Sequence, residues 1–452
     1  MTSRTSPGLG PMSFRIIAIG AVSLALVAAH SPLAAALAIV GLFLFGWTIW
    51  RKIPGDDSGV VRLSAVVASM TLLVSLLVSR TSVPDAVVDV RLPGAAIGVV
   101  ACAVIFIGAR RQSWRILGIA IAFLGVFVVT GQLAAEVWNS GLGTDIYQAH
   151  KAAGTALVNG QNPYTDAVRF FNGSPFVEDD AVLVGYPYPP VVLLTFGLVA
   201  AFTDPRLVSA AAWLAILIWA AWPALTRREH ANASLAVFLM LATLPGWPLI
   251  WYASWTEPLS LLLLLVALLS WQRSVLISGI LLGFALASKQ YLIFLAPLLA
   301  LHRDDDRLKR LGLAVTTALI TLIPPILLDP AAMYRSMIGN LAAIGYRPDS
   351  VSVVGLLSGF GIRFKLPETI WLILGVVVSV AVGLGSRSVP GLLGRAGVVL
   401  GCTFAIGLAF TNYWFLVMGM LAVSALLIGR DQVLPAMAHG DSRVGSRPQT
   451  RP

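Results

Sequence analysis

Long apolar segments separated by short polar ones make up most of this chain. A membrane-spanning helix needs about 20 apolar residues. Segments that meet this measure lie near residues 14–30, 31–50, 62–79, 94–109, 116–135, 206–226, 232–250, 256–271, 311–328, 368–385, 391–409 and 412–429, with a two-helix hairpin at 275–301. The pattern therefore predicts an all-α fold, a polytopic transmembrane helical bundle of about fourteen spans.

The apolar segment 189–203 does not fit this series. It is short and is bounded by Pro189, Pro190 and Pro205. If it crossed the membrane completely, the orientation of every later span would be reversed, and the basic residues between those spans would lie on the outer side. We expect a re-entrant or broken helix, which is tolerated where protein covers it.

Composition excludes an ordinary soluble protein. Hydrophobic residues make up 58% of the chain and charged residues 12%, whereas soluble domains carry about 25% charged residues. The net charge of +10 comes from basic residues between apolar segments. We attribute it to the positive-inside rule and expect no nucleic-acid partner. Cys102 and Cys402 lie in apolar runs, which indicates neither a disulfide framework nor a metal-thiolate site.

The basic groups predict the orientation in a plasma (inner) membrane. Those near residues 4–15, 51–62, 110–115, 227–228, 302–310, 387–395 and beyond 430 share one side if both termini are cytoplasmic. The chain then divides into N-terminal transmembrane helices at 1–137 and an outer loop at 138–188. A transmembrane module follows at 189–430, with a second outer loop at 329–367. The tail 431–452 is expected to be disordered.

The outer loop 138–188 contains a predicted short helix from Asp145 to Asn159. Thr144 or Asp145 is a suitable cap, and Gly160 is a suitable end. Tyr147 and Lys151 share one face of this helix at a spacing of four residues. The helix would lie on the membrane surface with Asp145 at its amino end. Alternatively, Asp145 only caps the helix and the loop is a solvated connector.

Other acids and histidines in this loop have simpler interpretations. We expect His150 at the surface rather than at a metal, and the acidic run 178–180 to be a solvated turn. No metal site and no cofactor are expected.

The order of several motifs resembles the integral-membrane glycosyltransferase-C superfamily. These are Asp145, Gly160–Tyr164 (Gly-Gln-Asn-Pro-Tyr), Tyr186–Pro190 (Tyr-Pro-Tyr-Pro-Pro), Trp255–Pro258, and Ala287–Tyr291 followed by Pro297. The likeness covers residues 116–430 and is strongest to bacterial polyprenol-phosphate-mannose-dependent α-mannosyltransferases and related arabinofuranosyltransferases. Tyr147 stands closer to the acid than that pattern expects, which leaves its role less defined.

The resemblance implies an inverting transfer of a single sugar, mannose or arabinofuranose. The donor would be a polyprenyl-phosphate sugar, and the acceptor a lipid-linked or cell-envelope glycan on the outer face. Asp145 would be the general base, because an attacking hydroxyl must lose its proton. The departing phosphate is already an anion, so it needs stabilising cations rather than an acid.

Lys289 is the best internal candidate for that cation. It interrupts the apolar run from Val275 to Leu301, where a lysine costs about 2.5–3.5 kcal/mol at the membrane centre. Alternatively, it lies at the hairpin tip and extends into water. Glu257 either holds a sugar hydroxyl or pairs with a cation. The complete set of expected substrate-binding residues is Tyr147, Lys151, Tyr188, Glu257, Lys289, Gln290 and Arg347.

Two other functions remain open from the residues alone. A transporter or flippase of lipid-linked saccharides should show internal repeats or charged pairs at the membrane midplane. A glycan polymerase or ligase would use the same outer loops with a diphosphate donor.

Overall fold

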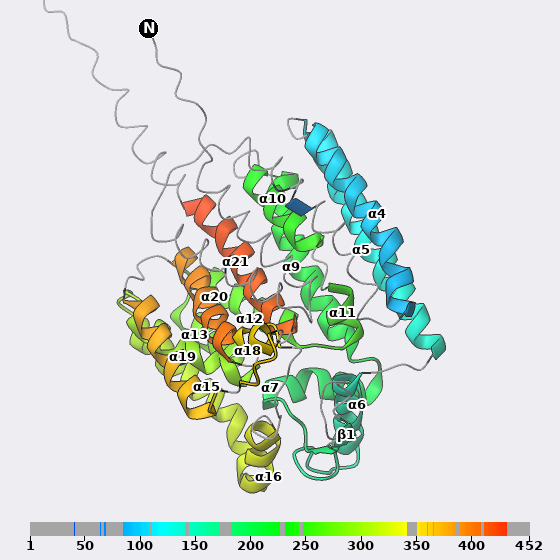
Figure 1. The fold of residues 1–452 in the computed structure, drawn as a ribbon. Helices are drawn as coiled ribbons and strands as arrows, with labels where there is room; N and C mark the ends of the chain where they lie inside the picture. Colours follow the sequence, from blue (N-terminus) through cyan, green and yellow to red (C-terminus); the bar gives the residue numbers. More distant parts are fainter. Residues whose placement is uncertain are drawn as a thin grey trace, which may run out of the picture.

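The computed structural model is mostly helical (Figure 1). It describes residues 40, 64, 67–68, 85–108, 111–140, 144–171, 182–226, 231–243, 247–340, 350–358, 360–364, 366–384, 389–407 and 411–431. The expected spans near 14–30, 31–50 and 62–79 therefore fall almost wholly outside the described residues, as does the expected disordered tail.

Helices alternate with short connections along the described chain. The elements up to the middle are α4 (Asp85–Gly108), α5 (Gln112–Ser140), α6 (Asp145–Val158), β1 (Arg169–Phe171), β2 (Val182–Val184), α7 (Pro190–Val192), η2 (Leu193–Gly197), α8 (Leu198–Phe202), α9 (Arg206–Thr226), α10 (Ala231–Ala242) and α11 (Trp247–Tyr252). They continue with α12 (Glu257–Leu269), α13 (Val275–Leu286), η3 (Gln290–Leu295), α14 (Ala296–Leu301), α15 (Arg307–Leu328), α16 (Pro330–Tyr334), η4 (Arg335–Gly339), α18 (Val353–Ser358), α19 (Glu368–Gly383), α20 (Val389–Ile406) and α21 (Thr411–Asp431).

Three helices in the described part are long and apolar enough to cross a membrane. They are the segment Gln112–Gln132 of α5, the whole of α9, and α15. Several other apolar helices are shorter, between 10 and 17 residues. At 1.5 Å per residue, 17 residues rise only about 26 Å, which is less than the roughly 30 Å of a bilayer core.

The apolar pattern located most of these helices correctly. The predicted segment 206–226 coincides with α9. The predicted segment 232–250, in contrast, contains two helices: α10 ends at Ala242, and α11 begins at Trp247. Pro245 and Gly246 lie in this interval, and both are poor helix formers.

The segment 189–203 forms a short helix, as its length suggested. Its three pieces, α7, η2 and α8, follow one another from Pro190 to Phe202. The middle piece is a π-helical turn, a feature frequent at functional sites. This helix belongs to the class that is too short to cross a bilayer core by itself.

The outer loop 138–188 is partly folded rather than a simple connector. Thr144 caps α6 by accepting a hydrogen bond from the Tyr147 backbone N–H at 3.3 Å, and Gly160 follows the helix with a φ of +67°. A two-stranded antiparallel hairpin, β1 with β2, follows in register Arg169 to Val184. The apolar pattern did not predict this hairpin.

This loop packs with the second expected outer loop around a hydrophobic core of its own. The buried members of that core are Ala149, Ala153, Ala156, Tyr164, Val168, Tyr186, Tyr188, Val192, Leu193, Phe196, Leu259, Ala332 and Met333. In Figure 1, α6, β1 and α16 lie together at the lower end of the view, opposite α10. The interpretation of 138–188 as a solvated connector is therefore wrong for its described residues 144–171 and 182–188.

A close approach between backbones holds α6 in this core. A Cβ on Gly154 would lie 2.6 Å from the Ala201 backbone nitrogen and 2.9 Å from the Gly197 carbonyl oxygen. Only glycine permits this spacing, because any side chain would separate the helices. The small residues of α6 therefore fix its position against η2 and α8.

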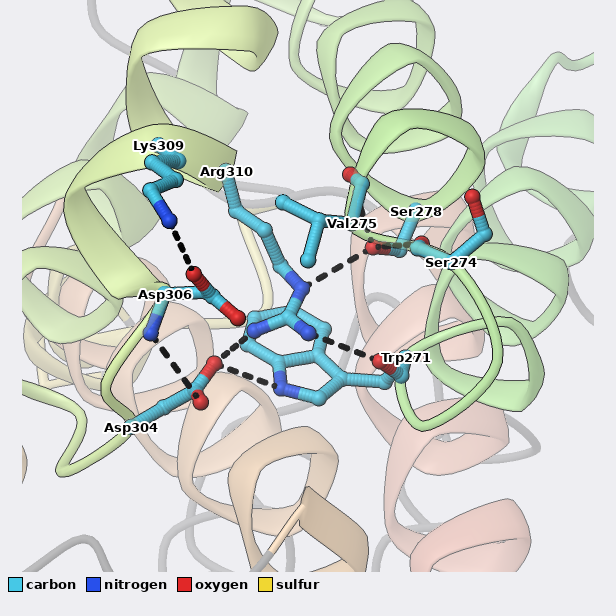
Figure 2. Close-up of polar contacts among 8 residues, drawn as sticks. All are labelled: Trp271, Ser274, Val275, Ser278, Asp304, Asp306, Lys309 and Arg310. Carbon is cyan, nitrogen blue, oxygen red and sulfur yellow. Dashed lines mark hydrogen bonds and ion pairs between the residues drawn. The ribbon is translucent and has the colours of Figure 1, made fainter.

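At the opposite end, a buried arginine joins two helical connections (Figure 2). The Arg310 guanidinium lies 4.4 Å from the ring centroid of Trp271 and donates to the Trp271 carbonyl at 2.7 Å. It also pairs with Asp304, which accepts a bond from the Trp271 indole N–H at 3.0 Å. These three residues connect the turn before α13 to the turn before α15. Arg310, one of the basic residues of 302–310, is thus 5% exposed rather than solvated.

This contact predicts a stability difference between two neighbouring aspartates. Asp304→Asn should lower the free energy of unfolding by about 3 kcal/mol, because it leaves a buried guanidinium without its counter-charge. Asp305 is exposed, so Asp305→Asn should stay within about 0.5 kcal/mol of the parent protein. Thermal unfolding of the purified protein in detergent measures both variants. Equal midpoints for the two would contradict the assigned role.

Candidate functional site

The amino end of α6 is fastened to the turn that precedes α12. The Thr144 hydroxyl donates to the Ala253 carbonyl at 3.1 Å, and His150 bonds the Ser254 carbonyl through Nε2 at 3.1 Å. Asp145 is the first residue of α6, and its Oδ1 accepts from the Ile146 backbone N–H at 2.8 Å. Asp145 therefore lies between Thr144 and His150, the two residues that contact the 253–254 backbone.

His150 is buried, which corrects the expectation that it lies at the surface. Its exposed fraction is 0%, and its ring stacks on Tyr188 and Phe196 at centroid distances of 5.6 and 4.7 Å. Because a carbonyl only accepts, Nε2 carries the proton that is shared with Ser254. Nδ1 then accepts from the Tyr186 hydroxyl at 2.7 Å. His150 is thus a neutral connector between three segments.

A second cluster lies directly after the same turn. Glu257 begins α12 and is 0% exposed, and its Oε1 accepts from Lys289 Nζ at 2.8 Å. The same oxygen accepts from Asn412 at 2.7 Å and from the Tyr291 hydroxyl at 3.2 Å. We call Glu257, Lys289, Tyr291 and Asn412 the Lys289–Glu257 centre. It joins the starts of α12 and α21 to the break between α13 and η3.

Lys289 is enclosed by aromatic rings. Its Nζ lies 4.4 Å from the ring centroid of Tyr188 and 5.7 Å from that of Tyr291, within the range of cation–π attraction. Lys289 is 2% exposed. The alternative in which this lysine extends into water is therefore wrong. Glu257 pairs with a cation, one of the two roles that the sequence left open for it.

Tyr188 connects the two clusters. Its ring stacks on His150 and covers Lys289. Burial raises the pKa of its hydroxyl well above the ordinary value, and the negative charges of Glu257 and Asp145 raise it further. The structure thus brings four of the expected site residues, Asp145, Tyr188, Glu257 and Lys289, into one neighbourhood.

The other expected site residues have contacts to the protein backbone or to another side chain. Lys151 Nζ donates to the Ala200 and Thr203 carbonyls at the end of α8. Gln290 donates to the Pro187 carbonyl at 2.6 Å. The Tyr147 ring lies 3.9 Å from the Arg206 guanidinium carbon. Arg347 lies outside the described residues, so its place in the site stays a prediction.

Sequence reasoning missed Asn412, Arg206 and Tyr413, whose ring centroid lies 5.9 Å from Lys289 Nζ. Asn412 is a buried amide at the start of an apolar helix, and a polar residue in such a position is a functional candidate by default. That signal could have identified it. Arg206 is 1% exposed and pairs with Asp204 at 3.1 Å. The sequence indicated only that Arg206 begins a span, because no pattern in the neighbouring residues predicts its stacking on Tyr147.

The arrangement combines a carboxylate, an enclosed ammonium group and a second carboxylate. Among the described residues, no three His, Cys, Asp or Glu side chains lie close enough together to hold a metal ion. The groups present are suited to accepting a proton at Asp145 and to attracting an anion at Lys289.

The buried histidine predicts a pH dependence of stability. Burial lowers the pKa of His150 to about 3, below the ordinary value of about 6.5 in the unfolded chain. Between these two pH values, His150 binds a proton in the unfolded chain but not in the folded chain. Stability is therefore complete above pH 6.5 and falls as the pH drops toward 3, by up to about 1.4 kcal/mol per pH unit.

His150→Phe retains the ring stacking and removes this proton, so its midpoint of thermal unfolding should change less between pH 6.5 and 4. Burial lowers the pKa of His302 to about 4, so His302→Phe should flatten the profile separately and the double variant should flatten it most. A profile for His150→Phe as steep as that of the parent would contradict the buried neutral state.

Comparison with known proteins assigns this chain to no family. No family model, no curated protein and no solved structure matches it.

Proposed function

We propose that this chain is an integral membrane glycosyltransferase of the inner membrane, with both termini cytoplasmic and about fourteen spans. It transfers one sugar, mannose or arabinofuranose, from a polyprenyl phosphate to a lipid-linked or cell-envelope glycan at the outer face. The resemblance in motif order supports the reaction class, and the three long apolar helices support the membrane setting.

One observation carries the proposal. Thr144 and His150 attach the helix of Asp145 to the backbone of residues 253 and 254. Glu257 lies at the end of the same turn, and Lys289 is paired with it. A carboxylate and an ammonium group from distant parts of the chain are thus organised around Tyr188. A transferase that uses a sugar phosphate needs this combination, a proton acceptor for the attacking hydroxyl and a cation for the leaving phosphate.

The proposed step is a single displacement. The acceptor oxygen forms a bond to the anomeric carbon as its proton passes to Asp145. The bond between that carbon and the phosphate oxygen breaks, and its electron pair leaves with the polyprenyl phosphate. Configuration at the anomeric carbon is inverted, and Lys289 stabilises the added charge on the phosphate. An ammonium group has three N–H donors, of which Glu257 receives one.

A transporter of lipid-linked saccharides is the second candidate, because a specific observation favours it. Transporters place paired charges inside their helical bundles, and Lys289 and Glu257 form such a buried pair at 2.8 Å. In this reading, protonation or substrate binding would alter the pair and open one side. The two functions differ at Asp145, which the transferase requires as a base and the transporter does not.

Asp145→Asn should reduce sugar transfer by at least about 100-fold, because the amide cannot accept the proton. Transfer is measured in membranes from a radiolabelled polyprenyl-phosphate sugar. Asp166→Asn is the matched control, since Asp166 is an exposed aspartate of the same outer loop, and it should retain full activity. More than a tenth of parental activity in Asp145→Asn would remove the catalytic assignment. Movement of intact lipid-linked saccharide across proteoliposomes, without transfer, would establish the transporter instead.

The proposed orientation is tested with two exposed positions at opposite ends, Asn159 and Asp305. Cys102 and Cys402 are first replaced by alanine to provide a cysteine-free background. In intact cells, Asn159→Cys should react with a membrane-impermeant thiol reagent, and Asp305→Cys should react only after permeabilisation. The reverse labelling pattern would place the Asp145 helix in the cytoplasm and overturn the outward-facing site.

A further inference from the structure

The turn from Ser254 to Glu257 contains three buried oxygens without hydrogen-bond partners among the described residues. They are Ser254 Oγ, Thr256 Oγ1 and Glu257 Oε2. All three residues are 0% exposed. A buried polar atom without a partner destabilises the folded state, so one four-residue turn concentrates a large local cost.

The backbone of the same turn is also strained. Ser254 has a φ of 59° and is the one non-glycine residue with positive φ in the described part of the chain. Thr256 occupies the capping position of α12, but its φ of −97° and ψ of −2° are helical and its hydroxyl makes no capping bond. Strain and unused polar groups persist where the surrounding structure enforces them, and such places cluster at ligand sites.

The turn is held firmly from several directions. Ala253 accepts from Thr144, Ser254 accepts from His150, and Trp255 accepts from the Ser209 hydroxyl at 2.7 Å. These bonds use the backbone carbonyls and leave the three side-chain oxygens unused. The polar groups are therefore preorganised in a way that local relaxation does not remove.

The chemistry of these oxygens selects the kind of ligand. Two hydroxyls both donate and accept, and a carboxylate oxygen accepts. A metal cation is disfavoured, because the Lys289 ammonium group lies 2.8 Å from the same carboxylate. An anion is disfavoured at Oε2 by the charge of Glu257 itself. A neutral group with several hydroxyls satisfies all three oxygens.

We infer that Ser254, Thr256 and Glu257 form a subsite that binds the hydroxyl groups of a sugar. The choice of a sugar, carried on a phosphate held by Lys289, rests on the proposed function, whereas recognition of hydroxyl groups rests on the turn alone. Because Ser254, Thr256 and Glu257 are each 0% exposed, the ligand enters by displacing side chains that cover them. On the phosphate side, the Tyr188 ring lies over Lys289, 4.4 Å from its Nζ to the ring centroid.

Thr256→Val tests the subsite, because valine has nearly the same shape and removes only the hydroxyl. The binding probes are a short synthetic isoprenyl phosphate and the same phosphate carrying mannose or arabinofuranose. Their dissociation constants are measured by calorimetry on the purified protein. Thr256→Val should reduce the preference for one sugar-bearing probe by about fivefold or more, while the affinity for the bare phosphate stays unchanged.

The same variant should become more stable, since it loses an unpartnered polar atom. Its midpoint of thermal unfolding without ligand should rise by about 1–3 °C. Thr403→Val is the matched control, because Thr403 is equally buried but its hydroxyl donates to the Val399 carbonyl at 2.8 Å. It should not gain stability and should keep the sugar preference.

Three outcomes would overturn the subsite. The first two are an unchanged sugar preference in Thr256→Val and a loss of stability in that variant. The third is that Na⁺ or Mg²⁺ stabilises the parent protein but not Thr256→Val. The last would identify a cation site. These results are separate from the transfer assay on Asp145→Asn. A protein that binds the sugar through Thr256 but transfers nothing would retain the subsite and lose the proposed function.

Discussion

The described structure depends most on one buried ion pair, between Lys289 and Glu257. An isolated charge in an apolar interior costs several kcal/mol, so each of these residues requires the other. Their 2.8 Å contact fixes the start of α12 against the break between α13 and η3, and Asn412 adds the start of α21. Such a pair contributes little net stability compared with apolar residues of the same volume. What it provides is a single register for three helix ends.

The loop that carries Asp145 is built onto this centre by neutral contacts. His150 bonds Ser254 and Tyr186 and stacks on Tyr188, so one uncharged ring connects α6, the 185–189 segment and the turn before α12. Small residues on α6 let it approach the backbone of η2 and α8, where Gly154 leaves no room for a side chain. The result is a second core separate from the main helical core. Asp145, at the start of α6, is thereby positioned by helix packing rather than carried on a flexible loop.

The two ends of the helices use charge in different ways. At the end opposite α6, Arg310 stacks on Trp271, pairs with Asp304 and donates to the Ser278 hydroxyl of α13, so its contacts join neighbouring segments (Figure 2). At the centre near Asp145, in contrast, Glu257 Oε2 and the Ser254 and Thr256 hydroxyls have no described partner. A paired charge that joins two segments stabilises the fold, whereas a turn with three unpartnered buried oxygens lowers stability at that place. This difference is the physical reason why the sugar subsite is proposed at the turn from Ser254 to Glu257.

The sequence by itself determined the features that follow from local patterns. Apolar length located α9 at 206–226, capping and glycine signals located α6 between Thr144 and Gly160, and charges in apolar surroundings identified Glu257 and Lys289 as candidates. Tertiary structure decided the rest. Four features depend on contacts between residues that are not neighbours in the chain. They are the burial of His150, the ion pair of Lys289 with Glu257, the hydrogen bond of Asn412 to Glu257, and the pairing of β1 with β2. Periodicity and propensity report on neighbours within a few residues, so a pairing across 32 or 155 positions leaves no local trace. Only the packing of the helices shows that a histidine expected at the surface is enclosed by aromatic rings. Packing likewise shows that Lys289, expected to bind a phosphate or alternatively to extend into water, has a carboxylate beside it.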